Sequence, residues 1–126
     1  MKKLALVLAL ASLSLSGCSL LNHHNTTTPV AQTYVGQLPC ADCSGIKTKL
    51  TLNPDLTYVM DQTYVGSREA QNTFQDKGTY TRKNDEVTLD SGMKIKVETK
   101  QIRLLNADGK VVTGPLAQYY VLELVR

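Results

Sequence analysis

Apolar and polar side chains alternate along most of the chain after residue 34. In the segment Ile46–Leu52, isoleucine, leucine and one threonine occupy one side, and lysine and threonine occupy the other. A period of two predicts a half-buried β-strand. Similar short segments follow, so we expect strands at residues 46–52, 56–64, 74–82, 86–89, 93–97, 101–105, 110–112 and 119–125. Beyond residue 17, no segment shows the 3.6-residue period of an amphipathic helix.

Short turn sequences separate the expected strands. Asn53-Pro54-Asp55, Lys83-Asn84-Asp85, Asp90-Ser91-Gly92 and Asn106–Gly109 are rich in residues that favour tight turns. Tight turns between successive strands give an antiparallel meander, and a meander of about seven or eight strands hides its edges best by curling up. The sequence therefore predicts an all-β fold, a small antiparallel meander that closes into a β-barrel. A barrel of this size is either filled by side chains or holds one small ligand.

The first seventeen residues have the pattern of an export signal. Met1–Lys3 is cationic and Leu4–Leu15 is apolar, and this run is shorter than the roughly 20 apolar residues of a membrane span. Leu15-Ser16-Gly17-Cys18 resembles the bacterial lipobox, in which a signal peptidase cuts before a cysteine that then carries lipid. This resemblance implies lipidation of Cys18 and a membrane anchor. By resemblance to lipoprotein sorting rules, the presence of Ser19 rather than aspartate after the cysteine implies the outer membrane. The alternative is an ordinary secreted protein in which Cys18 pairs with another cysteine.

The remaining chain divides into a tether and one domain. Residues 18–33 are mostly polar and lack apolar periodicity, which predicts a flexible tether. Residues 34–126 form the expected barrel domain. His23 and His24 in the tether are candidate metal ligands, although adjacent histidines in a solvated linker more often serve as polar filler.

Charge and histidine content exclude two classes of function. Loss of Lys2 and Lys3 with the signal lowers the net charge from +3 to +1, which removes the electrostatic basis for nucleic-acid binding. Both histidines of the chain lie in the tether, so a serine or cysteine nucleophile has no base held by the fold. We therefore expect no nucleic-acid partner and no enzymatic activity.

Cys40 and Cys43 are the pair that remains if Cys18 carries lipid. Two cysteines at this spacing can form a disulfide in an oxidising compartment, hold a soft ion such as Cu(I), or exchange with other thiols. The redox-enzyme alternative is the weakest, because a strand follows the pair directly and no helix N-terminus is available to stabilise a thiolate. Met60 and Met93 are candidate thioether ligands, although methionine also fills cores and Met93 lies on an apolar strand face.

The segment Gly36–Leu52, with Cys40-Ala41-Asp42-Cys43 near its middle, resembles the signature of the NlpE N-terminal domain family of copper-resistance and envelope-stress lipoproteins. Tyr64–Glu69, Phe74 and Gly78-Thr79-Tyr80 are similar to segments that follow in that family, so the resemblance covers about residues 34–125. It implies a lipocalin-like β-barrel anchored in the outer membrane and facing the periplasm. It also implies copper tolerance, with copper as a candidate cofactor, and the reporting of envelope or surface-contact stress to an inner-membrane sensor kinase.

One departure from the family and two alternatives limit this interpretation. Longer family members carry a second, C-terminal domain with its own cysteine pair, and the chain up to Arg126 does not contain it, so we do not carry over that domain's functions. The barrel is alternatively a carrier of an apolar ligand, or a purely structural interaction module with a Cys40–Cys43 disulfide. Arg68 and Glu69 are a candidate partner contact, or else a solvated ion pair of little energetic effect.

Overall fold

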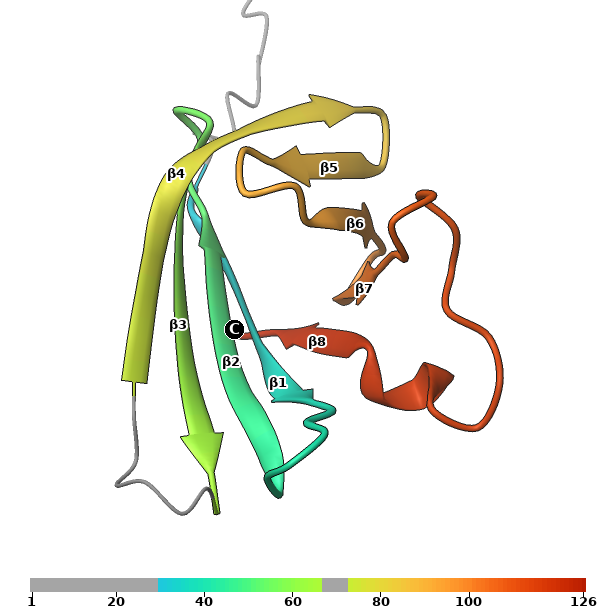
Figure 1. The fold of residues 1–126 in the computed structure, drawn as a ribbon. Helices are drawn as coiled ribbons and strands as arrows, with labels where there is room; N and C mark the ends of the chain where they lie inside the picture. The colour runs from blue at the N-terminus through green and yellow to red at the C-terminus, as the bar shows by residue number, and fades with distance from the viewer. Residues whose placement is uncertain (1–29, 67–72) are drawn as a thin grey trace, which may run out of the picture.

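The computed structural model describes residues 30–66 and 73–126, and within them each β-strand pairs antiparallel with the next. The last strand returns to the first, so that the sheet closes into a barrel (Figure 1). The predicted all-β meander that closes into a barrel is confirmed. No helix in the described part of the chain is long and apolar enough to cross a membrane. The strands are β1 (Gln32–Leu38), β2 (Gly45–Leu52), β3 (Thr57–Val65), β4 (Thr73–Lys83), β5 (Glu86–Leu89), β6 (Lys94–Val97), β7 (Gln101–Leu104) and β8 (Val121–Leu124).

The segment between β7 and β8 differs from the prediction. Residues 110–112 were expected to form a strand, but this is wrong, because they contribute only an isolated bridge between Leu105 and Val111. A glycine and a proline follow within a few residues and direct the chain away from the sheet. The last strand begins at Val121 rather than at residue 119, because Ala117–Tyr119 form a short 3₁₀ helix, η1.

The first strand of the barrel is the one that alternation marks least clearly. β1 begins at Gln32, two residues before the expected start of the domain. Tyr34 and Leu38 are buried and the position between them is Gly36, which has no side chain to show the pattern. β1 pairs with β2 over its whole length, whereas only Tyr34 and Val35 pair with β8.

Alternate side chains from all eight strands fill the barrel interior. The predicted inward face of β2 is confirmed, because Thr48, Leu50 and Leu52 are buried and Ile46 packs against the core. Burying one large apolar side chain contributes about 1.5–3 kcal/mol, so this core is the main source of stability. The buried apolar residues are Tyr34, Leu38, Leu50, Leu52, Tyr58, Met60, Tyr80, Val87, Leu89, Ile95, Ile102, Leu104 and Leu122.

One buried tyrosine is held by two carboxylates. The hydroxyl group of Tyr58, a residue only 1% exposed, lies 2.7 Å from Asp76 Oδ2 and 3.1 Å from Asp90 Oδ1, and its single proton is shared between these acceptors. Burial, reinforced by both carboxylates, raises the pKa of Tyr58 to about 12. Asp90 Oδ2 also accepts a hydrogen bond from the amide of Thr79 at 2.9 Å. A Cβ at position 78 would overlap the Asp90 carboxylate, 2.6 Å from its Cγ, so any other residue there would require Asp90 to move.

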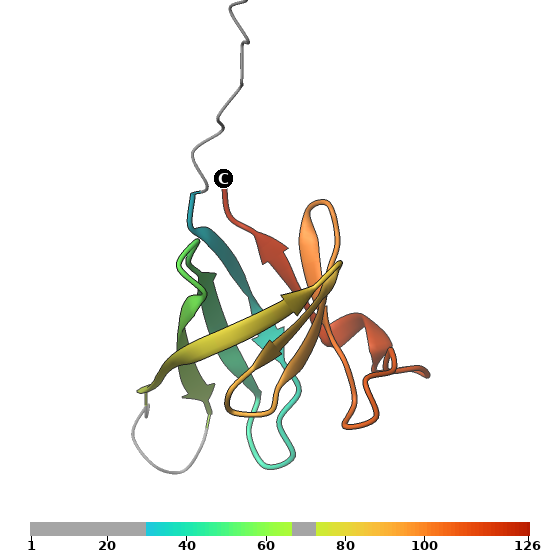
Figure 2. The same ribbon diagram turned by 90° about the horizontal axis from the view of Figure 1, so that it is seen from above.

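The up-and-down strand order places successive connections at alternate ends of the barrel. We call the end where the chain enters β1 the entry end, and it also holds the β2–β3, β4–β5 and β6–β7 turns and the end of β8. Val125 N donates to Thr33 O at 2.8 Å, so the two described chain ends lie side by side there (Figure 2). The β1–β2 loop and the β7–β8 connection lie at the opposite end, which we call the cysteine end. The seven residues of β1 separate the two ends by about 20 Å, at roughly 3.3 Å per residue.

Candidate functional site

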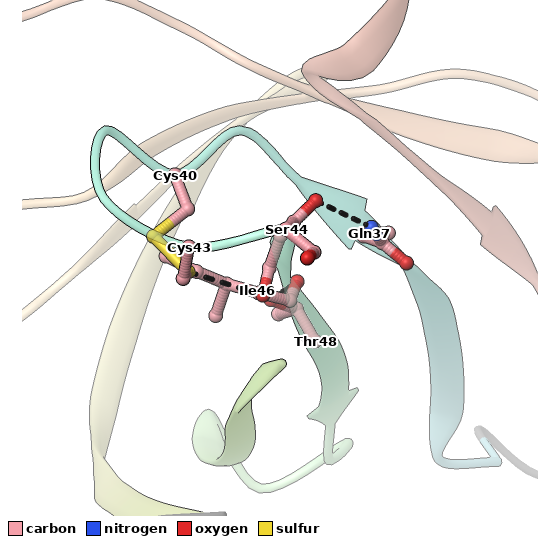
Figure 3. Close-up of a disulfide and its surroundings, with 7 residues drawn as sticks. Gln37, Cys40, Cys43, Ser44, Ile46 and Thr48 are labelled. Carbon is pink, nitrogen blue, oxygen red and sulfur yellow. Dashed lines mark hydrogen bonds between the residues drawn. A yellow bond between two sulfur atoms is a disulfide. The ribbon is translucent and has the colours of Figure 1, made fainter. Parts of the chain in front are cut away.

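The loop between β1 and β2 carries Cys40 and Cys43, which form a disulfide (Figure 3). Their sulfur atoms are 2.03 Å apart and their Cα atoms 5.3 Å apart. Of the three states that the sequence left open for this pair, the structure contains the disulfide. While oxidised, the pair offers no thiolate, and the thiolate is the form that attacks a substrate or binds a metal.

Neighbouring polar groups hold the loop against β1 and β3. Gln37 Nε2 donates to the carbonyl oxygen of Ser44 at 3.1 Å (Figure 3), and Ser44 N donates to Val65 O at 2.8 Å. The next residue is Gly45, where a Cβ would lie 2.7 Å from Cδ of Gln37. Glycine at this position therefore lets the Gln37 side chain reach across and fix the end of the loop.

Cys43 Sγ lies 3.4 Å from the carbonyl oxygen of Gly45 (Figure 3). A disulfide sulfur has no proton to donate, so in the oxidised protein this is a packing contact. Reduction by two electrons and two protons would give a thiol whose S–H is a weak donor toward the same oxygen. The reduced loop would thus have a hydrogen-bond partner already in place.

Two surface hollows flank the disulfide. One, of about 320 Å³, lies between both cysteines and Tyr64 of β3. The other, of about 430 Å³, lies between Cys40 and the β7–β8 connection, where Leu116 and Tyr119 line it. These two side chains are 53% and 49% exposed. Exposed apolar groups beside a polar loop are typical of surfaces that contact another molecule.

An aromatic pair borders the same end of the barrel. The rings of Tyr64 and Phe74 meet edge to face, with their centroids 5.7 Å apart and an interplanar angle of 87°. Such pairs are favourable beyond the area that they bury. Phe74 is 58% exposed, because β4 is paired with β5 only from Tyr80 onward and its first half has no strand on that side.

The oxidised pair does not fit a copper site. Cu(I) selects thiolate and thioether sulfur, and the disulfide supplies no thiolate. In residues 30–66 and 73–126, no group of three or more His, Cys, Asp or Glu side chains is placed to hold a metal ion. Met60 is buried in the core and Met93 packs against it, and neither lines the two hollows beside the disulfide. After reduction, Cys40 and Cys43 would supply two thiolates, which are the donors that a soft monovalent ion prefers.

Several residues that the sequence singled out lie outside the described residues. These are the lipidation candidate Cys18, the tether histidines His23 and His24, and the charged pair Arg68 and Glu69. The lipid anchor and the roles of these side chains therefore stay predictions. The sequence did not predict that Leu116 and Tyr119 lie beside the disulfide. Leu116, which follows directly after Gly114-Pro115, is the signal that would have indicated it.

The fold and the loop together define a class of protein: a small antiparallel β-barrel filled by its own side chains, with a disulfide-closed loop at one end. The sequence profile of the NlpE N-terminal domain family matches residues 34–115. The lipoprotein NlpE of Escherichia coli strain K12 is 39% identical over an alignment of 100 residues, and the match covers 71% of this chain and 42% of that relative.

Two solved structures share this barrel. A Shewanella oneidensis protein described as a lipoprotein has a TM-score of 0.68 and 34% identity, over 75% of this chain and 86% of its own. The Cpx pathway activator NlpE from E. coli has a TM-score of 0.59 and 34% identity, over 66% of this chain and 46% of its own. The chain belongs to the NlpE N-terminal domain family of lipoproteins. It spans less than half the length of E. coli NlpE.

Proposed function

We propose that this protein is a non-enzymatic, lipid-anchored envelope protein that takes part in copper tolerance and in envelope-stress signalling. The observation that carries the proposal is the Cys40–Cys43 loop, which the chain shares with its family by resemblance and which stands at one end of the barrel beside exposed apolar residues. Lipid on Cys18 would hold the barrel at the outer membrane, facing the periplasm. An inner-membrane sensor kinase is the proposed partner for signalling.

The redox state of the loop would select between its two roles. In the oxidised state the loop is a rigid contact surface without metal donors. In the reduced state the two thiolates of Cys40 and Cys43 would bind Cu(I) through sulfur. Copper binding by this pair therefore requires a reductant in the compartment, and the barrel itself supplies none.

Titration with Cu(I) tests the metal role. The mature protein is titrated in three forms, as reduced wild type, as oxidised wild type and as the reduced double variant Cys40→Ser/Cys43→Ser, with a colorimetric Cu(I) chelator as competitor. We expect one equivalent of Cu(I) to be withheld from the chelator by reduced wild type alone. Equal, weak competition by all three forms would remove the metal role of this pair.

A second candidate function is that of an interaction module with a permanent disulfide. It is favoured by the observed disulfide and by the exposure of Leu116 and Tyr119 beside it. Intact-mass measurement of envelope-purified protein, before and after thiol alkylation, should then show no alkylation at Cys40 or Cys43. The paired variant Leu116→Ser/Tyr119→Ser should lower activation of an envelope-stress reporter by the overproduced protein. Full alkylation of both cysteines would contradict the permanent disulfide.

An apolar-ligand carrier has less support. Core side chains from every strand occupy the barrel interior. Eight of these residues, Tyr58 among them, are at most 1% exposed. A filled interior is what an eight-stranded barrel without a ligand shows. We therefore do not propose a ligand inside the barrel.

A further inference from the structure

We propose that the entry end of the barrel docks on the surface of a phospholipid bilayer, with the side chain of Leu56 in contact with the lipid. The inference rests on the proposed lipid anchor at Cys18 and adds an orientation to it. The cysteine end would then point away from the bilayer. Three independent observations support this arrangement.

The first observation is the conformation of Leu56 at the tip of the β2–β3 turn. Its φ angle is 67°, in the left-handed region that glycine and asparagine adopt more easily than leucine. Leu56 N donates to Asn53 O at 3.2 Å, and Leu56 O accepts from Tyr80 N at 2.8 Å, so the backbone is fixed in this conformation. The side chain is 49% exposed, so burial in the barrel does not compensate fully for the backbone preference. Neither the turn nor the core explains a leucine here, and an outlier of this kind points to a function of the side chain.

The second observation is the composition of the entry end. Val30 is 70% exposed and Val125 is 48% exposed, and both belong to this end, because Val30 precedes β1 and Val125 follows β8. The β2–β3 turn lies at the same end as the described chain ends (Figure 2). Lys83, the last residue of β4, and Lys100, in the β6–β7 turn, are exposed cations at this end. Apolar side chains accompanied by lysines are the composition of surfaces that bind at a membrane interface.

Three carboxylates at the entry end have partners within the protein. Asp55 Oδ1 accepts from both the amide and the hydroxyl group of Thr57, at 3.1 and 2.6 Å. Asp85 lies 3.7 Å from the ammonium group of Lys96. Glu98 Oε1 lies 3.2 Å from Nε of Arg103. The two ion pairs offset the charges of Asp85 and Glu98, whereas the bonds from Thr57 keep Asp55 ionised and lower its pKa.

The third observation is the length of chain between the proposed anchor and the barrel. Residues 18–29 precede Val30, and a flexible segment of twelve residues has a root-mean-square length of about 19 Å. The chain enters the barrel at the entry end, and the cysteine end lies about 20 Å farther on, at the other end of β1. An anchor on Cys18 therefore holds the entry end closer to the bilayer than the cysteine end.

Tryptophan fluorescence tests the orientation, because the chain contains no tryptophan of its own. The full lipidated protein is prepared as two variants, L56W at the entry end and L116W at the cysteine end. The two wild-type leucines are matched in exposure, at 49% and 53%. Each variant is reconstituted into phosphatidylethanolamine–phosphatidylglycerol vesicles with or without bromine on the acyl chains, and acylation of Cys18 is verified by intact mass.

We expect bromolipid quenching to be about threefold stronger or more for L56W than for L116W, because interfacial side chains enter the acyl boundary to a depth of roughly 5–10 Å. The emission of L56W should also shift to the blue on reconstitution. Equal quenching of the two variants, or stronger quenching of L116W, would overturn the docking proposal. Absence of acyl chains on Cys18 would instead overturn the proposed anchor, so the two failures are distinguishable.

A variant that introduces neither tryptophan nor a charge tests whether the added tryptophan, rather than Leu56, causes the contact with lipid. Leu56→Asn keeps a residue that tolerates the left-handed conformation and removes the apolar side chain. A fluorophore is attached at Lys100, in the β6–β7 turn of the same end, in L56N and in the otherwise identical Leu56 protein. Bromolipid quenching of this fluorophore should be at least about twofold weaker in L56N, because interfacial binding scales with buried apolar area. Unchanged quenching would show that Leu56 makes no contact with lipid.

Discussion

Replacement of Gly78 by alanine is expected to destabilise the barrel through a single neighbour, the Asp90 carboxylate. The added Cβ would overlap both carboxylate oxygens, which already lie against the backbone of β4. Asp90 would have to move away, and it would lose its hydrogen bonds to the Thr79 amide and to the hydroxyl group of Tyr58. Tyr58 would keep Asp76 as an acceptor, at 2.7 Å, so its buried hydroxyl group would remain paired.

The magnitude follows from two opposing effects. Insertion of an extra methyl group into an occupied space destabilises by about 1–3 kcal/mol. Exchange of glycine for alanine at a position of ordinary backbone conformation stabilises by about 0.4–1 kcal/mol, because the unfolded chain loses freedom. Since the steric effect is the larger, G78A should lower the free energy of unfolding by about 1–2 kcal/mol. In the D90A background the obstacle is gone, and the same substitution should stabilise by about 0.4–1 kcal/mol.

Urea unfolding of wild type, G78A, D90A and G78A/D90A measures this double-mutant cycle. The midpoints are followed by circular dichroism, and the slopes are compared to confirm that the same surface is exposed on unfolding. The decisive result is the change of sign between the two backgrounds. If G78A destabilises by the same amount with and without Asp90, the two positions are additive and the proposed steric conflict is refuted.

Three further measurements test other parts of the structure. The pKa of Tyr58 is raised from 10.0 to about 12, so the contribution of its neutral hydroxyl group to stability is fully present below pH 10 and is lost as the pH rises toward 12. In urea titrations over this interval, Y58F should therefore lose less stability than wild type. Leu56→Asn should raise the free energy of unfolding by about 1 kcal/mol, because asparagine tolerates the left-handed conformation, and an unchanged urea midpoint would contradict this. Reduction of the Cys40–Cys43 disulfide should lower stability by about 2 kcal/mol, the entropic value for so short a loop, and the double serine variant should unfold at the midpoint of reduced wild type in differential scanning calorimetry.

The fold was predictable where one face of a strand is buried and the other is exposed. β2 is the clearest case, because Thr48, Leu50 and Leu52 are buried while Lys47 and Lys49 are exposed. Prediction failed where the pattern is short or incomplete. β1 has a glycine at one of its inward positions, and residues 110–112 include two valines but form only one isolated bridge. Whether such a segment becomes a strand depends on a partner elsewhere in the chain.

The candidate site was predictable in its residues but not in its state or surroundings. Two cysteines at this spacing are compatible with a disulfide, a metal or free thiols, and only the positions of their backbones decide among these. The neighbours Leu116 and Tyr119 come from the far end of the chain, where local sequence gives no sign of their proximity to the cysteines. The partnership of Tyr58 with Asp90 depends likewise on the register of β3, β4 and β5, which local sequence does not contain.

The parity of the strand number has a consequence for how this barrel combines with other protein segments. An even number of antiparallel strands returns the chain to the end at which it started, as the hydrogen bond between Val125 and Thr33 marks. Any segment fused after β8 would therefore emerge beside the one that precedes β1. Additions at either terminus would gather on one side and leave the disulfide loop unobstructed. The barrel can accept new neighbours in sequence without hiding the surface that carries its cysteines.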